Sequence, residues 1–193
     1  MIDLLNEIKA CEVCKPALLH APRPVLAATI HSKVMIIGQA PGRKVHESGT
    51  PWADKSGKVL RSWLNVNEDQ FYNADNFAII PMGFCYPGRG KSGDLPPRPE
   101  CAPLWHPQLL EHLGKVKLTL LIGQYAQRYY LGKSAKRNLT ETVRNFEDYL
   151  PRYSPLPHPS PRNRFWLRKN PWYQAETLPK LQLLVAENLG RSA

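Results

Sequence analysis

Short uninterrupted apolar runs divide the chain and predict the strands of a buried sheet. Such runs lie at residues 34–37, 76–80 and 117–123, and a shorter one follows at 153–157. A strand that is apolar at every position, rather than at alternate positions, is typical of a parallel sheet covered by helices on both faces. We therefore expect a central, mostly parallel four-stranded sheet.

Apolar residues at helical spacing predict helices between these strands. The predicted helices cover residues 2–10, a segment ending at residue 64, and residues 101–113, 124–132 and 178–189. The proline-rich residues 15–32 are expected to form a loop, and residues 142–149 fit either a short helix or a loop. The repeated order of strand, turn and helix predicts an α/β fold, a three-layer sandwich with its sheet flanked by helices. No shift of composition divides the chain, so residues 1–193 are expected to form one domain.

The first predicted strand ends in a turn of small residues, Gly38-Gln39-Ala40-Pro41-Gly42. In parallel sheets, ligands bind just beyond the carboxyl ends of the strands. Glycine lets the backbone approach a ligand closely, and a glutamine amide can read a polar ring edge as donor and acceptor. The alternative is an ordinary strand-to-helix turn.

Trp52 lies in a polar loop after this turn, where a large aromatic side chain either anchors the loop or offers a flat face to a ligand. Its position after the first strand favours the ligand. A second candidate is His158, which stands between two prolines and precedes Ser160, Arg162, Asn163 and Arg164. Prolines fix the backbone, and hydroxyl and guanidinium groups suit phosphate oxygens. A proline-rich turn with a structural histidine is the alternative.

The charge of the chain narrows the class of partner. Lys and Arg number 26 against 16 Asp and Glu, which gives a formal charge of +10 and favours a polyanion such as nucleic acid. A basic surface can also serve solubility alone. Residues 165–173 interleave aromatic and basic side chains, as in single-strand and flipped-base binders, although core packing explains some of these aromatics equally well.

The expected compartment bears on the state of the four cysteines. The amino terminus lacks the basic start and apolar core of a secretory signal, and no segment reaches the ~20 apolar residues of a membrane span, so a cytoplasmic protein is expected. In a reducing compartment, four cysteines are better explained by a metal, a cluster or burial than by disulfides. They form a close pair, Cys11 and Cys14, and a pair that brackets a Gly/Pro-rich loop, Cys85 and Cys101.

Taken in this order, the segments resemble the uracil-DNA glycosylase superfamily, and most closely its iron–sulfur branch (families 4 and 5). The resemblance covers nearly the whole chain. It rests on the spacing of the four cysteines, the turn at residues 38–42, Ser48-Gly49-Thr50-Pro51-Trp52, the strand ending at Gly123, and His158-Pro159-Ser160. It implies that the cysteines hold a 4Fe-4S cluster, with a structural zinc as the alternative.

The resemblance also implies a role for each matching residue. Gln39 and the backbone of Ala40 would be catalytic and, with Gly38, would face the edge of the base, while Trp52 would stack on its ring. His158 would be catalytic by stabilising the negative charge that develops on the departing base. The DNA would be bound by Ser160 at a phosphate, by Arg162 in the gap left by the flipped nucleotide, and by the neighbouring Asn163 and Arg164.

Three positions depart from the family pattern. Pro81 stands where many relatives use an asparagine to read uracil, Ala40 where some carry an aspartate that orients water, and Gln39 where family 4 often has glutamate. Water activation then has to come from elsewhere. Lys44, His46 and Glu47, in the adjacent loop, could supply a polar group, and the alternative is that each is a solvated side chain.

The expected function is hydrolysis of the N-glycosidic bond of a deaminated or otherwise damaged base, uracil or a related one, flipped out of DNA by a monomeric enzyme. One alternative is a non-catalytic iron–sulfur protein that binds nucleic acid with the same fold. Another is a hydrolase of free nucleosides, which fits the positive charge less well.

Overall fold

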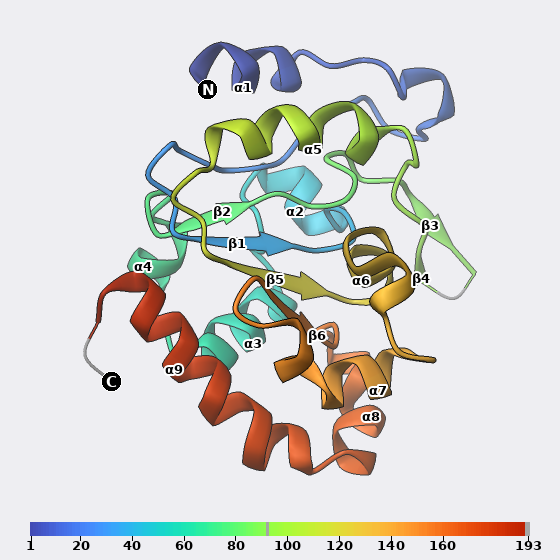
Figure 1. Ribbon diagram of the computed structural model, residues 1–193. Helices are drawn as coiled ribbons and strands as arrows, with labels where there is room; N and C mark the ends of the chain where they lie inside the picture. The colour runs from blue at the N-terminus through green and yellow to red at the C-terminus, as the bar shows by residue number, and fades with distance from the viewer. Residues whose placement is uncertain (92, 192–193) are drawn as a thin grey trace.

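Four parallel strands form the centre of the fold (Figure 1), in a computed structural model that describes residues 1–91 and 93–191. Their order in the sheet is β2-β1-β5-β6, with bounds Val34–Ile37 (β1), Phe77–Ile79 (β2), Leu118–Ile122 (β5) and Tyr153–Leu156 (β6). Ile36 of β1 pairs with Ile79 of β2 on one side and with Leu120 of β5 on the other. The predicted four-stranded parallel sheet is therefore confirmed.

Helices cover both faces of this sheet. The principal ones span Ile2–Lys9 (α1), Lys55–Leu64 (α3), Cys101–His112 (α5), Gln124–Leu131 (α6) and Leu178–Leu189 (α9). Val34 and Ile36 belong to the core that includes residues of α3 and α9, below the sheet in Figure 1. Met35 and Ile37 point the other way, into the core that includes residues of α1, α5 and α6. This alternation produces the three layers expected from the sequence, because successive strand residues face opposite sides.

Shorter elements complete the described part of the chain. Four short helices span Arg43–Ser48 (α2), Glu68–Tyr72 (α4), Leu139–Arg144 (α7) and Arg164–Lys169 (α8). A two-stranded hairpin joins Arg89–Gly90 (β3) to Gly93–Asp94 (β4). Single helical turns of other types lie at Lys15–Ala17, Gly132–Ser134, Phe146–Tyr149, Pro161–Asn163 and Tyr173–Thr177.

The predicted long helices all form, and the differences lie in the connections. The segment after Gly42 was expected to be a loop, but it forms α2. Gly42 precedes the helix in an extended conformation and Gly49 ends it at a φ of 73°, so the two glycines bracket one short helix. The undecided segment 142–149 contains the end of α7 and a 3₁₀ turn. Within the described ranges, no helix combines the length and apolar character that a membrane span requires.

Candidate active site

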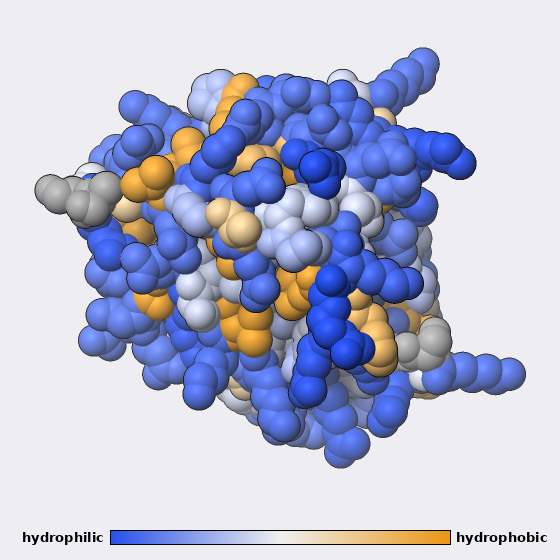
Figure 2. All heavy atoms as spheres, turned by 90° about the horizontal axis from the view of Figure 1, so that it is seen from below, coloured by the Kyte–Doolittle hydropathy of each residue, from blue (hydrophilic) through white to orange (hydrophobic). Residues whose placement is uncertain are grey.

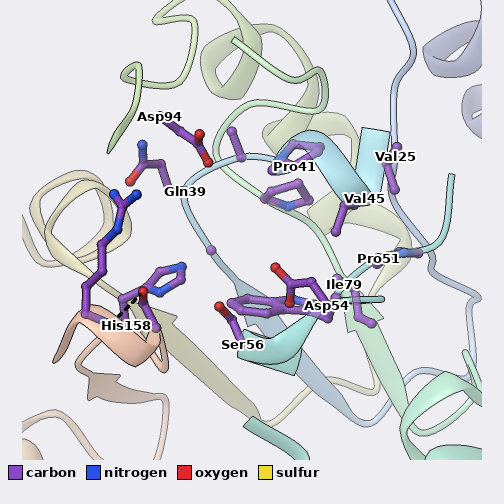
Figure 3. Close-up of a pocket in the computed structure, with 17 residues that line it drawn as sticks. Val25, Gln39, Pro41, Val45, Pro51, Asp54, Ser56, Ile79, Asp94 and His158 are labelled. Carbon is purple, nitrogen blue, oxygen red and sulfur yellow. Dashed lines mark hydrogen bonds between the residues drawn. The ribbon is translucent and has the colours of Figure 1, made fainter. Parts of the chain in front are cut away.

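A pocket of about 260 Å³ opens beyond the carboxyl ends of the strands (Figure 3). Its walls come from the turn after β1, the loop before α3, the end of β4 and the segment after β6. The residues that line it are Val25, Gly38, Gln39, Ala40, Pro41, Gly42, Val45, Pro51, Trp52, Asp54, Ser56, Ile79, Pro81, Asp94, His158, Ser160 and Arg162. The structure thus brings most of the predicted site residues together, and it adds two carboxylates.

The turn after β1 is fixed by the segment that follows β2. The Met82 N–H donates to the Gly38 carbonyl at 2.8 Å, and the Gly83 N–H donates to the Gln39 carbonyl at 3.0 Å. The Gln39 side chain donates from its amide nitrogen to the Leu95 carbonyl at 2.9 Å. That amide nitrogen is therefore directed at the chain beyond the hairpin rather than at a ligand.

Trp52 forms one wall of the pocket through close contact with two glycines. Its backbone has a φ of 56°, in the left-handed region. A Cβ atom placed on Gly38 would lie 3.0 Å from the indole ring, and one placed on Gly57 would lie 1.8 Å from the Trp52 carbonyl oxygen. Only glycine fits at these two positions without a shift of Trp52, which explains how the sequence places a large aromatic ring here.

His158 lies beside this indole. The two ring centroids are 5.6 Å apart, with an interplanar angle of 34°. Nδ1 of His158 is buried and has no hydrogen-bond partner among the described residues. Burial lowers the pKa of His158, while the nearby Asp54 carboxylate acts to raise it. Because the pKa moves below its ordinary value of 6.5, the imidazole is neutral at pH 7.

Asp54 supplies a carboxylate to the pocket at the start of α3. Its Oδ1 accepts the Gly57 N–H at 2.8 Å and so caps the helix. In Figure 3 its side chain lies in the pocket with Ser56 beside it. The sequence analysis missed Asp54, although an aspartate just before an apolar helical segment is a helix-start signal and could have drawn attention to it.

Asp94 is the second carboxylate that the sequence analysis missed. It ends β4, and the hairpin carries it to the pocket, where Figure 3 shows it near Gln39. Partial burial raises the pKa of Asp94; Arg162 and Arg89 oppose this shift and Asp54 adds to it. No local sequence signal identifies Asp94, because its place depends on how the hairpin returns to the β1 turn.

In the segment after His158, some side chains line the pocket and another holds the backbone of the histidine. Ser160 and Arg162 line the pocket, and the Arg162 N–H donates to Ser160 Oγ at 3.2 Å. The Asn163 amide nitrogen donates to the His158 carbonyl at 2.6 Å, so this side chain holds the histidine backbone in place. Arg164 is exposed at the start of α8 and does not line the pocket.

The three suggested sources of water activation, Lys44, His46 and Glu47, do not line the pocket. All three belong to α2, whose inward position is taken by Val45. Lys44 and Glu47 are exposed, and the His46 ring packs at 5.9 Å from the ring of Tyr86. The prediction was wrong because it treated this segment as a loop, whereas a helix directs consecutive side chains to different sides.

Pro81 lines the pocket, and a buried histidine of α5 binds its backbone. The Pro81 carbonyl accepts a hydrogen bond from His106 Nε2 at 3.1 Å. His106 Nδ1 must then accept from the Tyr130 hydroxyl, 2.6 Å away, because a carbonyl cannot donate. Burial lowers the pKa of His106 to about 4, although the hydrogen bond to Pro81 acts to raise it. The histidine is therefore a neutral support for the pocket.

The four cysteines meet in a second, smaller pocket of about 20 Å³. None forms a disulfide, and its lining includes Cys11, Cys14, Cys85 and Cys101. The Phe84 N–H donates to the Cys101 sulfur at 3.3 Å. Burial raises the pKa of the Cys85 thiol to about 11 and that of Cys101 to about 12. Within residues 1–91 and 93–191, no group of three or more His, Cys, Asp or Glu side chains is already arranged to hold a metal ion.

The aromatic and basic segment from residue 165 divides into two parts. Trp166, Trp172 and Tyr173 pack edge to face and lie in or against the core. Phe165 is instead 69% exposed, with the Arg168 guanidinium 4.6 Å from its ring centre. The face that carries α8 and α9 is largely hydrophilic, with hydrophobic residues in small groups (Figure 2).

Comparison with protein-family models adds independent information to this geometry. Residues 26–182 match the family described as the Uracil DNA glycosylase superfamily. The match includes the whole pocket apart from Val25, together with Cys85 and Cys101, whereas Cys11 and Cys14 precede it. Membership supports a glycosylase-type function in DNA repair in general. The chain, with its parallel α/β sheet and its pocket at the strand ends, belongs to the uracil DNA glycosylase superfamily.

Proposed function

We propose that this protein hydrolyses the N-glycosidic bond of a damaged base that has been flipped out of DNA. The observation that carries the proposal is the meeting of an aromatic ring, a neutral imidazole and a carboxylate in one pocket: Trp52, His158 and Asp54. A flipped base needs a flat surface to stack on, and bond cleavage needs a base for water and a partner for the leaving group.

Each of these groups has a distinct part in the proposed reaction. The extruded base stacks on Trp52 and meets the backbone at Gly38 and Ala40. Asp54 accepts a proton from water, which attacks the sugar carbon as the bond to the base breaks. His158 stabilises the departing base through a hydrogen bond, and such preorganised donors are most effective where water is excluded. Base extrusion costs a few kcal/mol, which stacking and phosphate contacts offset.

The DNA backbone is proposed to lie along the segment after His158. Ser160 and Arg162 line the pocket, and Arg164 is exposed next to them. The formal charge of +10 supports phosphate binding. Asn163 acts in this proposal mainly by holding the His158 carbonyl.

The thiol pocket is proposed to hold a 4Fe-4S cluster, with zinc as the alternative. Four thiols without a carboxylate or imidazole are the usual donor set of such clusters, and N–H groups directed at sulfur, such as that of Phe84, tune them. The high thiol pKa values mean that metal binding must release protons from these groups. A cluster and unpaired cysteines fit a cytoplasmic location.

The test uses oligonucleotide duplexes that carry a single uracil, hypoxanthine, xanthine or methylated purine, followed by alkaline cleavage at any abasic site. We expect the cluster-loaded protein to excise at least one lesion, and the His158→Ala variant, purified in the same way, to excise it far more slowly. The variant controls for glycosylases of the expression host. Absence of cleavage with every lesion would refute the enzymatic proposal.

A second candidate is a non-catalytic DNA-binding protein, favoured by Ala40 and Pro81, which lack the side chains that many relatives use. The carboxylate of Asp54 in the pocket argues against it. Binding that falls steeply with salt, is equal for damaged and undamaged DNA, and comes with no turnover would support this second candidate.

A further inference from the structure

Two carboxylates stand among the polar groups of this pocket, beside possible donors at Ser56, His158, Ser160 and Arg162. Asp54 and Asp94 both line it. Pro81 has no donor, and its carbonyl is bound to His106. The Gln39 amide nitrogen donates to Leu95 instead of facing the pocket. A uracil ring exposes two carbonyl oxygens, which require donors, and position 81 supplies none.

The remaining wall is apolar. Val25, Pro41, Val45, Pro51 and Ile79 line the pocket. Figure 3 shows Pro41, Val45 and Pro51 on the side away from Gln39 and Asp94. The indole of Trp52 adds a flat ring. Such a wall can accept a hydrophobic substituent on the base, such as a methyl group.

The two carboxylates also favour a positive charge in the space that they share. The pKa of Asp94 is raised by partial burial, and the nearby Asp54 contributes to the rise. A cation between them would be attracted by both, and an aromatic face such as that of Trp52 also attracts cations. Arg162, which lines the same pocket, and Arg89 of β3 act to lower the pKa of Asp94 and reduce this attraction in part.

We propose that the base taken up by this pocket is a purine made cationic by N-alkylation, such as 7-methylguanine or 3-methyladenine in DNA, rather than uracil. The proposal rests on the glycosylase function proposed above and assigns its substrate class. Asp94 is the residue that selects the charged base, while Trp52 and the apolar wall hold its ring and its alkyl group.

The chemistry of such a base suits the groups present. The oxygen of water forms a bond to the sugar C1′ as the C1′–N9 bond breaks, and the bonding electron pair passes to N9. This pair neutralises the positive charge of the purine, which leaves as a neutral base. One proton of the water passes to the Asp54 carboxylate, and the product is an abasic site with a C1′ hydroxyl. Because no negative charge has to form on the base, less stabilisation of the leaving group is required, and Asp54 takes the water-activating part that an aspartate at position 40 has in some relatives.

The first experiment measures single-turnover excision from matched duplexes that contain 7-methylguanine, 3-methyladenine, hypoxanthine or uracil. We expect the methylated purines to be excised faster. Asp94→Asn should lower the ratio of methylpurine to hypoxanthine excision by roughly 10- to 100-fold, the effect of losing one hydrogen bond to a charged group. Glu47→Gln is the matched control, since it removes one carboxylate outside the pocket.

The second experiment needs no turnover. Quenching of tryptophan fluorescence is followed while 7-methylguanosine or guanosine is added to the wild type and to Asp94→Asn. Tighter binding of the methylated nucleoside by the wild type, lost in the variant, is expected. Equal affinities would overturn the assignment of substrate class.

The outcomes separate this inference from the function on which it rests. Excision of uracil or hypoxanthine without excision of methylated purines overturns the substrate class and leaves the glycosylase function intact. No excision of any base refutes the glycosylase function, and the nucleoside titration then decides whether the pocket selects cations.

Discussion

The ring of Trp52 and the ring of His158 lie 5.6 Å apart, although one follows the first strand of the sheet and the other follows the last. In the proposed function, a base stacked on the indole would therefore lie close to the imidazole. Stacking and leaving-group stabilisation are thus available in one place, but each side chain acts on a different step, so their substitution should have different effects.

Replacement of His158 by alanine should lower the single-turnover rate of excision of an uncharged base, such as hypoxanthine, by about 10²–10³-fold, the range for loss of one preorganised donor. DNA affinity should change little, because phosphate contacts come from other residues. His31→Ala is the control, since His31 is exposed and outside the pocket. An unchanged rate in His158→Ala would mean that this histidine is only structural.

Replacement of Asp54 by serine should separate its role as the cap of α3 from its proposed role as general base. Serine retains an oxygen that can cap α3, so the thermal midpoint should stay close to that of the wild type. Loss of the carboxylate should reduce excision by about 10²–10⁴-fold, the usual contribution of a general base. Asp54→Ala should show the same loss of rate and a further loss of about 1 kcal/mol in stability. Full activity of Asp54→Ser would exclude Asp54 as the base.

Gly57→Ala should displace Trp52, because the added Cβ would lie 1.8 Å from its carbonyl oxygen. Alanine normally stabilises a helix relative to glycine by about 0.5–1 kcal/mol, so destabilisation here would report the clash. We expect a loss of about 1–3 kcal/mol in urea unfolding, the cost of overpacking, and weaker quenching of tryptophan fluorescence by ligand. Gly114→Ala is the control, since nothing lies within 4 Å of its added Cβ. Similar behaviour of the two variants would contradict the proposed packing.

Protein purified without air should be brown, with broad visible absorption, and should contain iron and sulfide. Alanine at Cys11, Cys14, Cys85 or Cys101 should remove the colour or the soluble yield, because the four thiols come from distant segments that one centre ties together. A colourless protein with stoichiometric zinc would replace the cluster by the alternative metal. Ser48→Ala, an exposed change away from this pocket, should keep the colour.

His106 should make the protein less stable in acid. Its pKa is about 4 in the folded protein and near 6.5 when unfolded, so the unfolded chain binds more protons between these values. Stability is therefore lost as the pH falls from about 6.5 towards 4, by roughly 3 kcal/mol at 1.36 kcal/mol per pKa unit. Urea unfolding of wild type and His106→Gln at pH 7 and pH 4.5 measures this difference. If both lose equal stability on acidification, His106 is not responsible.

The sequence predicts the parts of this site that depend on local patterns. The apolar runs identify all four strands, and the small residues at 38–42 and the prolines around His158 mark the loops at their ends. Membership of the superfamily follows from the same segments. These features are local, since a few neighbouring residues determine each one.

The features that sequence analysis missed depend on contacts across the fold. Asp94 reaches the pocket only because the hairpin folds back towards the β1 turn. Asp54 was overlooked because its position at the start of α3 gives no sign that His158, from the segment after β6, lies near it. Lys44 and Glu47 were chosen by proximity in the chain, but the phase of α2 turns Val45 inward and leaves them in solvent. The roles of Arg162, Asn163 and Arg164 on DNA, and the occupant of the thiol pocket, stay predictions.

The segment from Pro81 to Cys85 joins the two pockets through its backbone. Its N–H groups at Met82 and Gly83 hold the β1 turn, and the N–H of Phe84 meets Cys101. A one-residue insertion or deletion here would break both sets of bonds together, whereas a new side chain at position 81 would leave them in place. Base preference in this lineage can therefore diversify by point substitution at position 81, without any redesign of the backbone that carries the site.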